Sequence, residues 1–207
     1  MAQLMFTGCS TMKVTPLTAS QADSYPKHQE VNGIVVGIQP MTDAKEIKDT
    51  FKVNLLDKGV LPVLVVVENK RPDTSITIVK DKVCLRDQAA GTSSLPERKK
   101  VTSDTGKGLA AAGAVLVACC VIPAIPVLFE GMQMNSNASI IEFNLGDEEF
   151  YTHTLGPGEK AQGFVYFQLV GGTSTSGNYH LIAEVNDPAS HEATTFDFPM
   201  TLNLPKK

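Results

Sequence analysis

Cys9 has the neighbours that lipid attachment to a cysteine requires. It ends the short run Leu4-Met5-Phe6-Thr7-Gly8-Cys9, in which small residues directly precede the thiol. Enzymes that acylate such a thiol and then cleave before it need this pattern, although Leu is usual where Phe6 stands. We therefore expect Cys9 to be a lipid attachment site. Residues 1–8 would then be the remnant of a signal peptide, because they lack the basic start and the full apolar stretch of a complete one.

Three short segments match parts of known catalytic motifs, but their flanking residues do not fit those motifs. Asp104-Thr105-Gly106 has the letters of an aspartic-protease loop, but polar residues precede it where an apolar strand should stand. Ser10-Thr11-Met12-Lys13 matches the serine–lysine acylation motif, yet it lies in a stretch with the composition of a linker. Gly106-Lys107-Gly108 lacks the remaining residues of a phosphate-binding loop. We expect neither an enzyme nor a cofactor.

Metal ligation has little support from the spacing of the ligand types. The histidines have no HExxH arrangement, and the cysteines no paired CxxC. Asp147-Glu148-Glu149 offers oxygen ligands of the kind that calcium prefers, but a solvated hairpin turn is the simpler interpretation. We expect no metal site and favour buried free thiols, with a disulfide through Cys84 left open. The residues concerned are His28, His153, His180, His191, Cys84, Cys119 and Cys120.

The uncharged run from Gly108 to Phe129 is the second candidate for function. As a helix it would be long enough to cross the ~30 Å hydrocarbon core of a bilayer. A single crossing would put half of the strands on each side of a membrane, and neither half could close a sandwich alone. Three interpretations stay open: a helix buried against the domain, a re-entrant or interfacial element, and a surface for a partner or a second copy. The residues expected to make membrane or partner contacts are Gly108, Leu109, Val115, Leu116, Val117, Val121, Ile122, Ile125, Val127, Leu128 and Phe129.

Composition limits the remaining function classes. The chain has 207 residues, of which 43% are hydrophobic and 19% charged, and its net charge is −4. Nucleic-acid binding depends on clustered Lys and Arg, and the dense cluster Arg98-Lys99-Lys100 lies in a loop-like stretch. We therefore expect no nucleic-acid partner.

The elements that must position these residues begin after a polar stretch. Residues 9–30 are expected to form a flexible tether, because they are rich in Ser, Thr, Pro and Gln. Alternation from Ile34 to Ile38 predicts a first strand that ends at Pro40. A short helix follows, capped by Thr42 or Asp43, with a stop at Gly59. Its core-facing residues are spaced by four, namely Ile47, Phe51 and Leu55.

Strand patterns account for most of the rest of the chain. Val63–Val67 is continuously apolar, which predicts a central strand covered on both faces, and Ile76–Leu85 is its expected partner. In the second half, alternation predicts strands at Ile141–Leu145, Gly163–Leu169, Tyr179–Val185 and Phe196–Leu202. Because Pro199 cannot donate to a ladder, the last strand should lie at an edge. Six or seven such strands predict an antiparallel Ig-like β-sandwich over residues 31–205, with an apolar helical insertion at 106–131.

Three motifs carry a resemblance to known proteins. Gly59-Val60-Leu61-Pro62-Val63-Leu64-Val65-Val66-Val67-Glu68-Asn69, Thr154-Leu155-Gly156-Pro157-Gly158-Glu159 and Gly163-Phe164-Val165-Tyr166-Phe167 resemble those of uncharacterised bacterial envelope lipoproteins. That resemblance implies an Ig-like domain interrupted by an apolar segment, and it carries no activity with it.

These features predict a non-enzymatic module that makes protein or membrane contacts. It would sit in the bacterial cell envelope, on the periplasmic face of the outer membrane, anchored in membrane lipid through Cys9. The alternative is a periplasmic carrier of a lipid or acyl chain, with the apolar segment as its lid.

Overall fold

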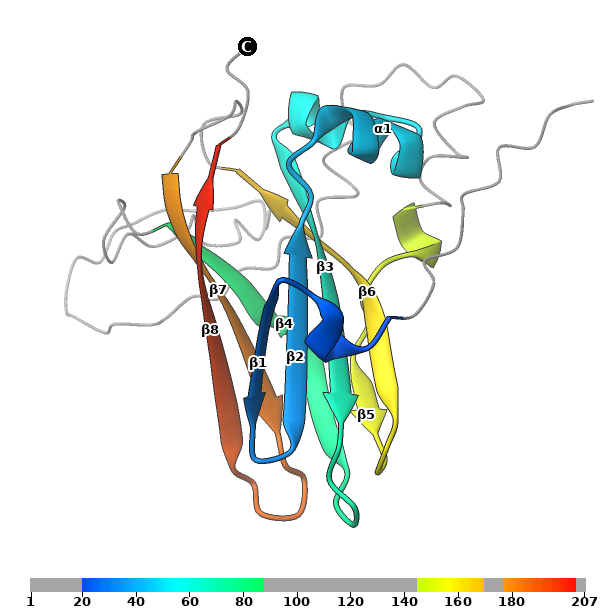
Figure 1. Ribbon diagram of the computed structural model, residues 1–207, viewed down its shortest axis with the longest axis vertical. Helices are drawn as coiled ribbons and strands as arrows, with labels where there is room; N and C mark the ends of the chain where they lie inside the picture. The colour runs from blue at the N-terminus through cyan, green and yellow to red at the C-terminus, as the bar shows by residue number, and fades with distance from the viewer. Residues whose placement is uncertain (1–19, 88–144, 170–176, 204–207) are drawn as a thin grey trace, which may run out of the picture.

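The computed structural model describes residues 20–87, 145–169 and 177–203 (Figure 1). Cys9, the 106–131 insertion, the basic triplet 98–100 and the motifs at 10–13 and 104–108 lie outside these ranges, as do Cys119 and Cys120. The described strands are β1 (Lys27–Val31), β2 (Ile34–Pro40), β3 (Val60–Asn69), β4 (Ile76–Asp87), β5 (His153–Leu155), β6 (Lys160–Gln168), β7 (Gly177–Asn186) and β8 (Ala193–Leu202). The short helical elements are η1 (Ala22–Ser24), α1 (Ala44–Phe51) and η2 (Leu55–Lys58).

Two four-stranded antiparallel sheets form a sandwich. One sheet has the order β1-β2-β3-β6 and is called sheet A; the other has the order β5-β4-β7-β8 and is called sheet B (Figure 1). The predicted antiparallel sandwich is therefore confirmed. The chain crosses between the sheets from β3 to β4, from β5 to β6 and from β6 to β7. The partnership expected between Val63–Val67 and Ile76–Leu85 is wrong, because these segments lie in different sheets.

The alternating segments of the second half form strands with one buried face. In β7 the buried positions include Tyr179, Leu181 and Val185, and in β8 they are Phe196, Phe198, Met200 and Leu202. β8 pairs with β7 alone among the described strands, so the prediction that Pro199 marks an edge strand is confirmed.

Sheet A has its apolar residues on both faces. β3 lies between β2 and β6, and Val60 to Val67 are all buried, as the continuous run predicted. One face packs on sheet B. The other is covered in part by α1, because the Phe51 ring meets the rings of Phe164 and Tyr166 edge-on at 4.9 and 5.9 Å.

α1 begins where the sequence predicted and ends earlier. Asp43 caps it by accepting a hydrogen bond from the backbone N–H of Glu46 at 2.8 Å. The helix ends at Phe51, since Lys52 adopts a left-handed conformation with φ 63°. Leu55 begins the separate element η2, which ends at Gly59 with φ 72°. Two short elements therefore replace the single predicted helix, and both still bury the expected apolar residues.

The folded part begins inside the stretch expected to be tether. η1 lies against sheet A so closely that a Cβ on Gly37 would stand 2.3 Å from the carbonyl oxygen of Ala22. β1 then pairs with β2, and its Lys27 and Gln29 side chains donate to backbone carbonyls of β8 at 2.9 and 2.6 Å. The strand β1 escaped sequence analysis because most of its side chains are exposed and it has no apolar alternation.

Candidate functional site

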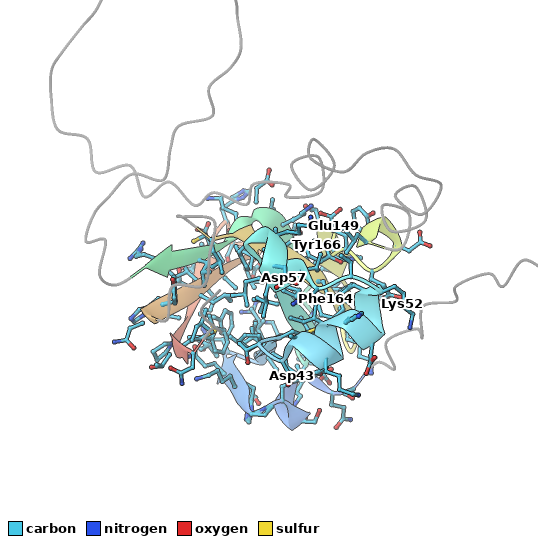
Figure 2. All side chains as sticks on the ribbon, turned by 90° about the horizontal axis from the view of Figure 1, so that it is seen from above. Asp43, Lys52, Asp57, Glu149, Phe164 and Tyr166 are labelled. Carbon is cyan, nitrogen blue, oxygen red and sulfur yellow. The ribbon has the colours of Figure 1, made fainter. Side chains whose placement is uncertain are left out.

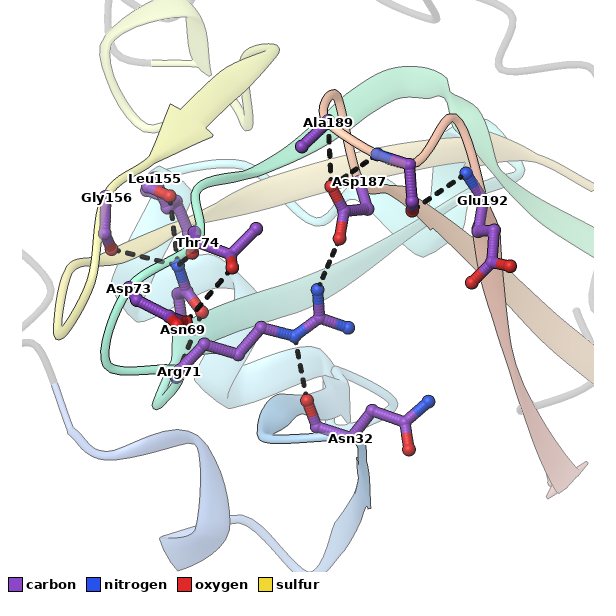
Figure 3. Close-up of polar contacts among 11 residues, drawn as sticks. Asn32, Asn69, Arg71, Asp73, Thr74, Leu155, Gly156, Asp187, Ala189 and Glu192 are labelled. Atoms are coloured by element: carbon purple, nitrogen blue, oxygen red, sulfur yellow. Dashed lines mark hydrogen bonds and ion pairs between the residues drawn. The ribbon is translucent and has the colours of Figure 1, made fainter.

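One end of the sandwich gathers the turns between strands, and we call it the turn end. It consists of the β1–β2 turn (32–33), the β3–β4 connection (70–75), the β5–β6 turn (156–159) and the β7–β8 turn (187–192). Figure 3 shows the polar contacts that join them. This end has the densest polar network of the part that the structure describes, so it is the candidate site for contacts.

Asn69, the last residue of β3, is fully buried and joins two of these turns. Its side-chain Nδ2 donates to the carbonyl oxygens of Thr74 at 2.8 Å, and of Leu155 and Gly156 at 3.1 Å. Its Oδ1 accepts from the backbone N–H of Arg71 at 3.1 Å. A buried amide that satisfies both of its ends in this way fixes the relative positions of the segments that it contacts.

Arg71 extends the network to the other two turns. Its Nε donates to the carbonyl oxygen of Asn32 at 2.8 Å, and its Nη1 forms an ion pair with Asp187 at 2.8 Å. Only 18% of the Arg71 side chain and 15% of the Asp187 side chain are exposed. The other carboxylate oxygen of Asp187 accepts from the backbone N–H groups of Ala189 and Ser190. Those two N–H groups, with Arg71, hold the pKa of Asp187 below its usual value.

A second polar cluster closes the side of the sandwich between β4 and β6. Lys80 of β4 forms an ion pair with Glu149, and both side chains are largely buried. The backbone of 148–150 runs beside β6, with Phe150 N–H donating to the Phe164 carbonyl at 2.8 Å. Gly163 permits this approach, since a Cβ there would lie 2.6 Å from the Cα of Phe150.

This cluster corrects the interpretation of Asp147-Glu148-Glu149 as a solvated hairpin turn. Residues 145–147 are helical, and Glu149 is paired and partly buried. The same helical turn corrects the end of the strand predicted at Ile141–Leu145, whose residues 141–144 lie outside the described ranges. Burial, and then the charge of Asp147, raise the pKa of Glu148. Lys80 could not be predicted as the partner of Glu149, because it lies 69 residues away along the chain.

A buried tyrosine lies next to this cluster. The Tyr166 hydroxyl donates to the carbonyl oxygen of Leu145 at 3.2 Å. Burial, followed by the carboxylates of Glu149 and Glu148, raises its pKa well above the usual range. Tyr166 is therefore a neutral hydrogen-bond donor. It holds Leu145, which lies in the segment before β5.

The histidines lie on separate elements. His28 Nδ1 lies 2.8 Å from the Tyr25 carbonyl, the His153 ring meets Phe150 edge-on, and His180 contacts Asp197 at 2.7 Å. His191 has φ 59° in the β7–β8 turn. Within the described ranges, no three His, Cys, Asp or Glu side chains are grouped so that they could hold a metal ion.

The predicted lipid and contact residues cannot be joined to this geometry. Cys9 and Gly108–Phe129 both lie outside the described residues, whereas Cys84 lies in β4 and is buried. Among the helices that the structure describes, none combines the length and the apolar character needed to span a membrane.

None of Asn69, Arg71 and Asp187 was predicted as a site residue. One signal for Asn69 was available: it continues the inward alternation of Val63, Val65 and Val67, so a polar side chain there had to be buried. No protein-family model matches the chain, and no curated protein matches it.

Proposed function

We propose that this protein is a non-enzymatic module of the bacterial cell envelope, anchored in a membrane through a lipid on Cys9. In this proposal the turn end is the surface that contacts a partner protein. The observation that carries it is the network of Asn69, Arg71 and Asp187, which holds four separate turns in one arrangement.

A fixed set of turns suits recognition because little conformational entropy is lost when a partner binds. Three of these turns also present an exposed proline (Pro72, Pro157 and Pro188), which restricts the backbone further. Other surfaces of sheet A are occupied by the molecule itself: η1 and α1 cover part of its outer face, and the Lys27 and Gln29 side chains join its β1 edge to β8.

We further propose that the sandwich is Ig-like. The support is the topology, in which β2-β3-β6 faces β5-β4-β7-β8 and the chain crosses between the sheets three times from β3 to β7. In such sandwiches the loops at one end commonly carry recognition, an argument from fold analogy. The strand β1, which pairs with β2, is an additional strand at the edge of the β2-β3-β6 sheet.

The interior supports a contact module over the alternative of a lipid carrier. Between the sheets, the described apolar side chains form one continuous cluster that includes Phe150, Phe196 and Phe198. A carrier would have to place its ligand elsewhere, for instance under the Gly108–Phe129 segment.

Membrane anchoring is tested by Cys9→Ala in a full-length precursor. We expect the variant to move from the membrane fraction to the soluble fraction and to lose the mass of a diacylglycerol. Cys84→Ala is the matched control, because its thiol is buried in the fold and its loss should leave fractionation unchanged. If Cys9→Ala stays with membranes, the anchor is instead the segment Gly108–Phe129.

The contact surface is tested with a photo-crosslinking residue placed in cells at Ala189, an exposed position of the turn end. The matched control is Thr195, which is exposed on the outer face of sheet B. A crosslinked partner that appears from Ala189 and not from Thr195 supports the proposal. Crosslinks from Thr195 alone would move the contact surface to sheet B.

A further inference from the structure

The β1–β2 turn has the residues of a self-modifying site. Asn32 and Gly33 are the single Asn-Gly pair of the chain and form a two-residue turn, closed by the pairing of Val31 with Ile34. Both adopt positive φ, 51° and 73°, and Asn32 is exposed. Figure 3 shows its side-chain amide pointing away from the network that its backbone carbonyl joins.

An Asn followed by Gly can react with its own backbone. Hydroxide or water takes the proton of the Gly33 backbone nitrogen, which would then attack Cγ of the Asn32 side chain and form a C–N bond. The C–NH₂ bond breaks, and the leaving group takes a proton from water and departs as ammonia. Water then opens the resulting succinimide ring at either carbonyl. The products are aspartate, or isoaspartate with the main chain routed through the former side chain. Glycine favours the attack because it has no Cβ to obstruct it.

The structure adds a specific promoter to this general chemistry. Arg71 Nε donates at 2.8 Å to the carbonyl oxygen of Asn32, which belongs to the same peptide group as the nitrogen of Gly33. When that nitrogen loses its proton, the negative charge is shared with this oxygen. A cationic donor already in place there stabilises the developing anion.

Arg71 is itself held in this position. Asp187 binds its Nη1, and Asn69 Oδ1 accepts its backbone N–H. The turn is held as well, because the carbonyl of Gly33 accepts from the backbone N–H of Lys70 at 2.8 Å. We infer that Asn32–Gly33 is a site of spontaneous succinimide formation, with Arg71 as the residue that promotes it.

The modification would act on the turn end directly. Aspartate places a negative charge on the exposed side chain of the turn. Isoaspartate leaves its free carboxylate at the former main-chain carbonyl that Arg71 contacts, and it adds one main-chain carbon to a two-residue turn. Because a hairpin turn sets the register of its strands, the longer chain would loosen the pairing of β1 with β2. This inference stands apart from the proposed contact function, since it concerns the chemistry of the turn and not its partner.

The test follows the conversion of Asn32 in the full chain at mildly alkaline pH, by peptide mass mapping and by enzymatic methylation of isoaspartate. Arg71→Gln removes the donor, and we expect conversion to slow about tenfold, as the loss of a charge-assisted hydrogen bond predicts. Lys82→Gln is the matched control, since it removes an exposed positive charge that pairs with Glu184 on β7, so its rate should stay close to that of the wild type.

The same measurement in urea separates the effect of the Asn-Gly sequence from the effect of the positioned Arg71. In the unfolded chain the wild type and Arg71→Gln should convert at equal rates, because no donor is positioned there. If the folded wild type does not convert while the unfolded chain does, the turn protects Asn32 and the inference is wrong. It is also wrong if folded Arg71→Gln converts as fast as the wild type. Should Arg71→Gln fail to fold, Arg71→Lys replaces it, since Lys keeps the charge but lacks the Nε donor.

Discussion

The two ends of the sandwich are closed by different chemistry. At the turn end, hydrogen bonds and one ion pair from Asn69, Arg71 and Asp187 join turns that are far apart in the sequence. At the opposite end, α1 and η2 are held by apolar burial, with Ile47, Phe51 and Leu55 no more than 1% exposed. Figure 2 looks down on this helix end, where Asp43 and Lys52 mark the two ends of α1 near Phe164 and Tyr166.

The two kinds of interaction differ in what they contribute to the fold. Apolar burial contributes free energy roughly in proportion to area and tolerates small shifts of the groups involved. Hydrogen bonds to buried groups contribute less individually, but they require defined positions and are costly to leave unmade. The helix end should therefore contribute more to the free energy of unfolding. The turn end should do more to fix the relative positions of the turns.

The largest effect should come from the helix end. Phe51→Ala removes the ring that packs on Phe164 and Tyr166, and we expect the free energy of unfolding to fall by about 4 kcal/mol. Urea denaturation measures this change. Phe51→Leu is the control, because it keeps most of the buried volume and should cost less than half as much. Equal losses from both variants would mean that ring contacts, and not burial, hold α1.

The corresponding change at the turn end is Asn69→Ala. It leaves buried carbonyl groups without their donor, so we expect a loss of about 3 kcal/mol in the free energy of unfolding. Amide hydrogen exchange should also quicken in the turns at 70–75 and 156–159. Asn178→Ala is the control, since that side chain is exposed and accepts a single hydrogen bond from Thr201. An effect larger than that of Phe51→Ala would reverse the comparison between the ends.

The start of α1 allows a finer test. Asp43→Ala removes the side-chain cap on the backbone N–H of Glu46, and the expected cost is about 1 kcal/mol. Asp43→Asn keeps a capping oxygen and should be close to the wild type in thermal unfolding. If both substitutions cost the same, the charge of Asp43 matters more than its hydrogen bond.

The smallest effect concerns pH. The pKa of Asp187 is lowered in the folded protein, so its charged form stabilises the fold above the ordinary pKa of 3.8. This contribution is lost as pH falls through the lower folded value. Between neutral pH and pH 3, the wild type should therefore lose more stability than Asp187→Asn, as chemical denaturation at several pH values would measure. Parallel losses would show that other carboxylates dominate acid unfolding.

Several parts of the fold followed directly from residue patterns. The alternation in β7 and β8, the buried run in β3 and the edge position of Pro199 were predicted and confirmed, and of the two candidate caps, Thr42 and Asp43, the structure uses Asp43. Each rests on interactions between residues close in sequence or on a periodicity of two, which a linear pattern contains. β1 and β5 were missed because they are short and polar, and they exist only through pairing with longer strands.

The candidate site was much less predictable than the fold. Arg71 lies in a segment with ordinary turn composition, and the partners of Asn69 and Arg71 at Leu155, Gly156 and Asp187 are 86 to 116 residues away. Nothing in the sequence pairs such distant residues. The predictions that depend on Cys9 and Gly108–Phe129 remain predictions.

The sequence by itself determined the longer strands, such as β3, β7 and β8, and which of their faces are apolar, because backbone sterics and burial act locally. The tertiary structure decided which strands share a sheet, that residues 22–31 belong to the fold, and that Glu149 pairs with Lys80. It also decided that Asn69 and Arg71 gather four turns at one end. Those outcomes depend on the packing of two sheets, which brings together groups whose separation along the chain carries no signal of their contact.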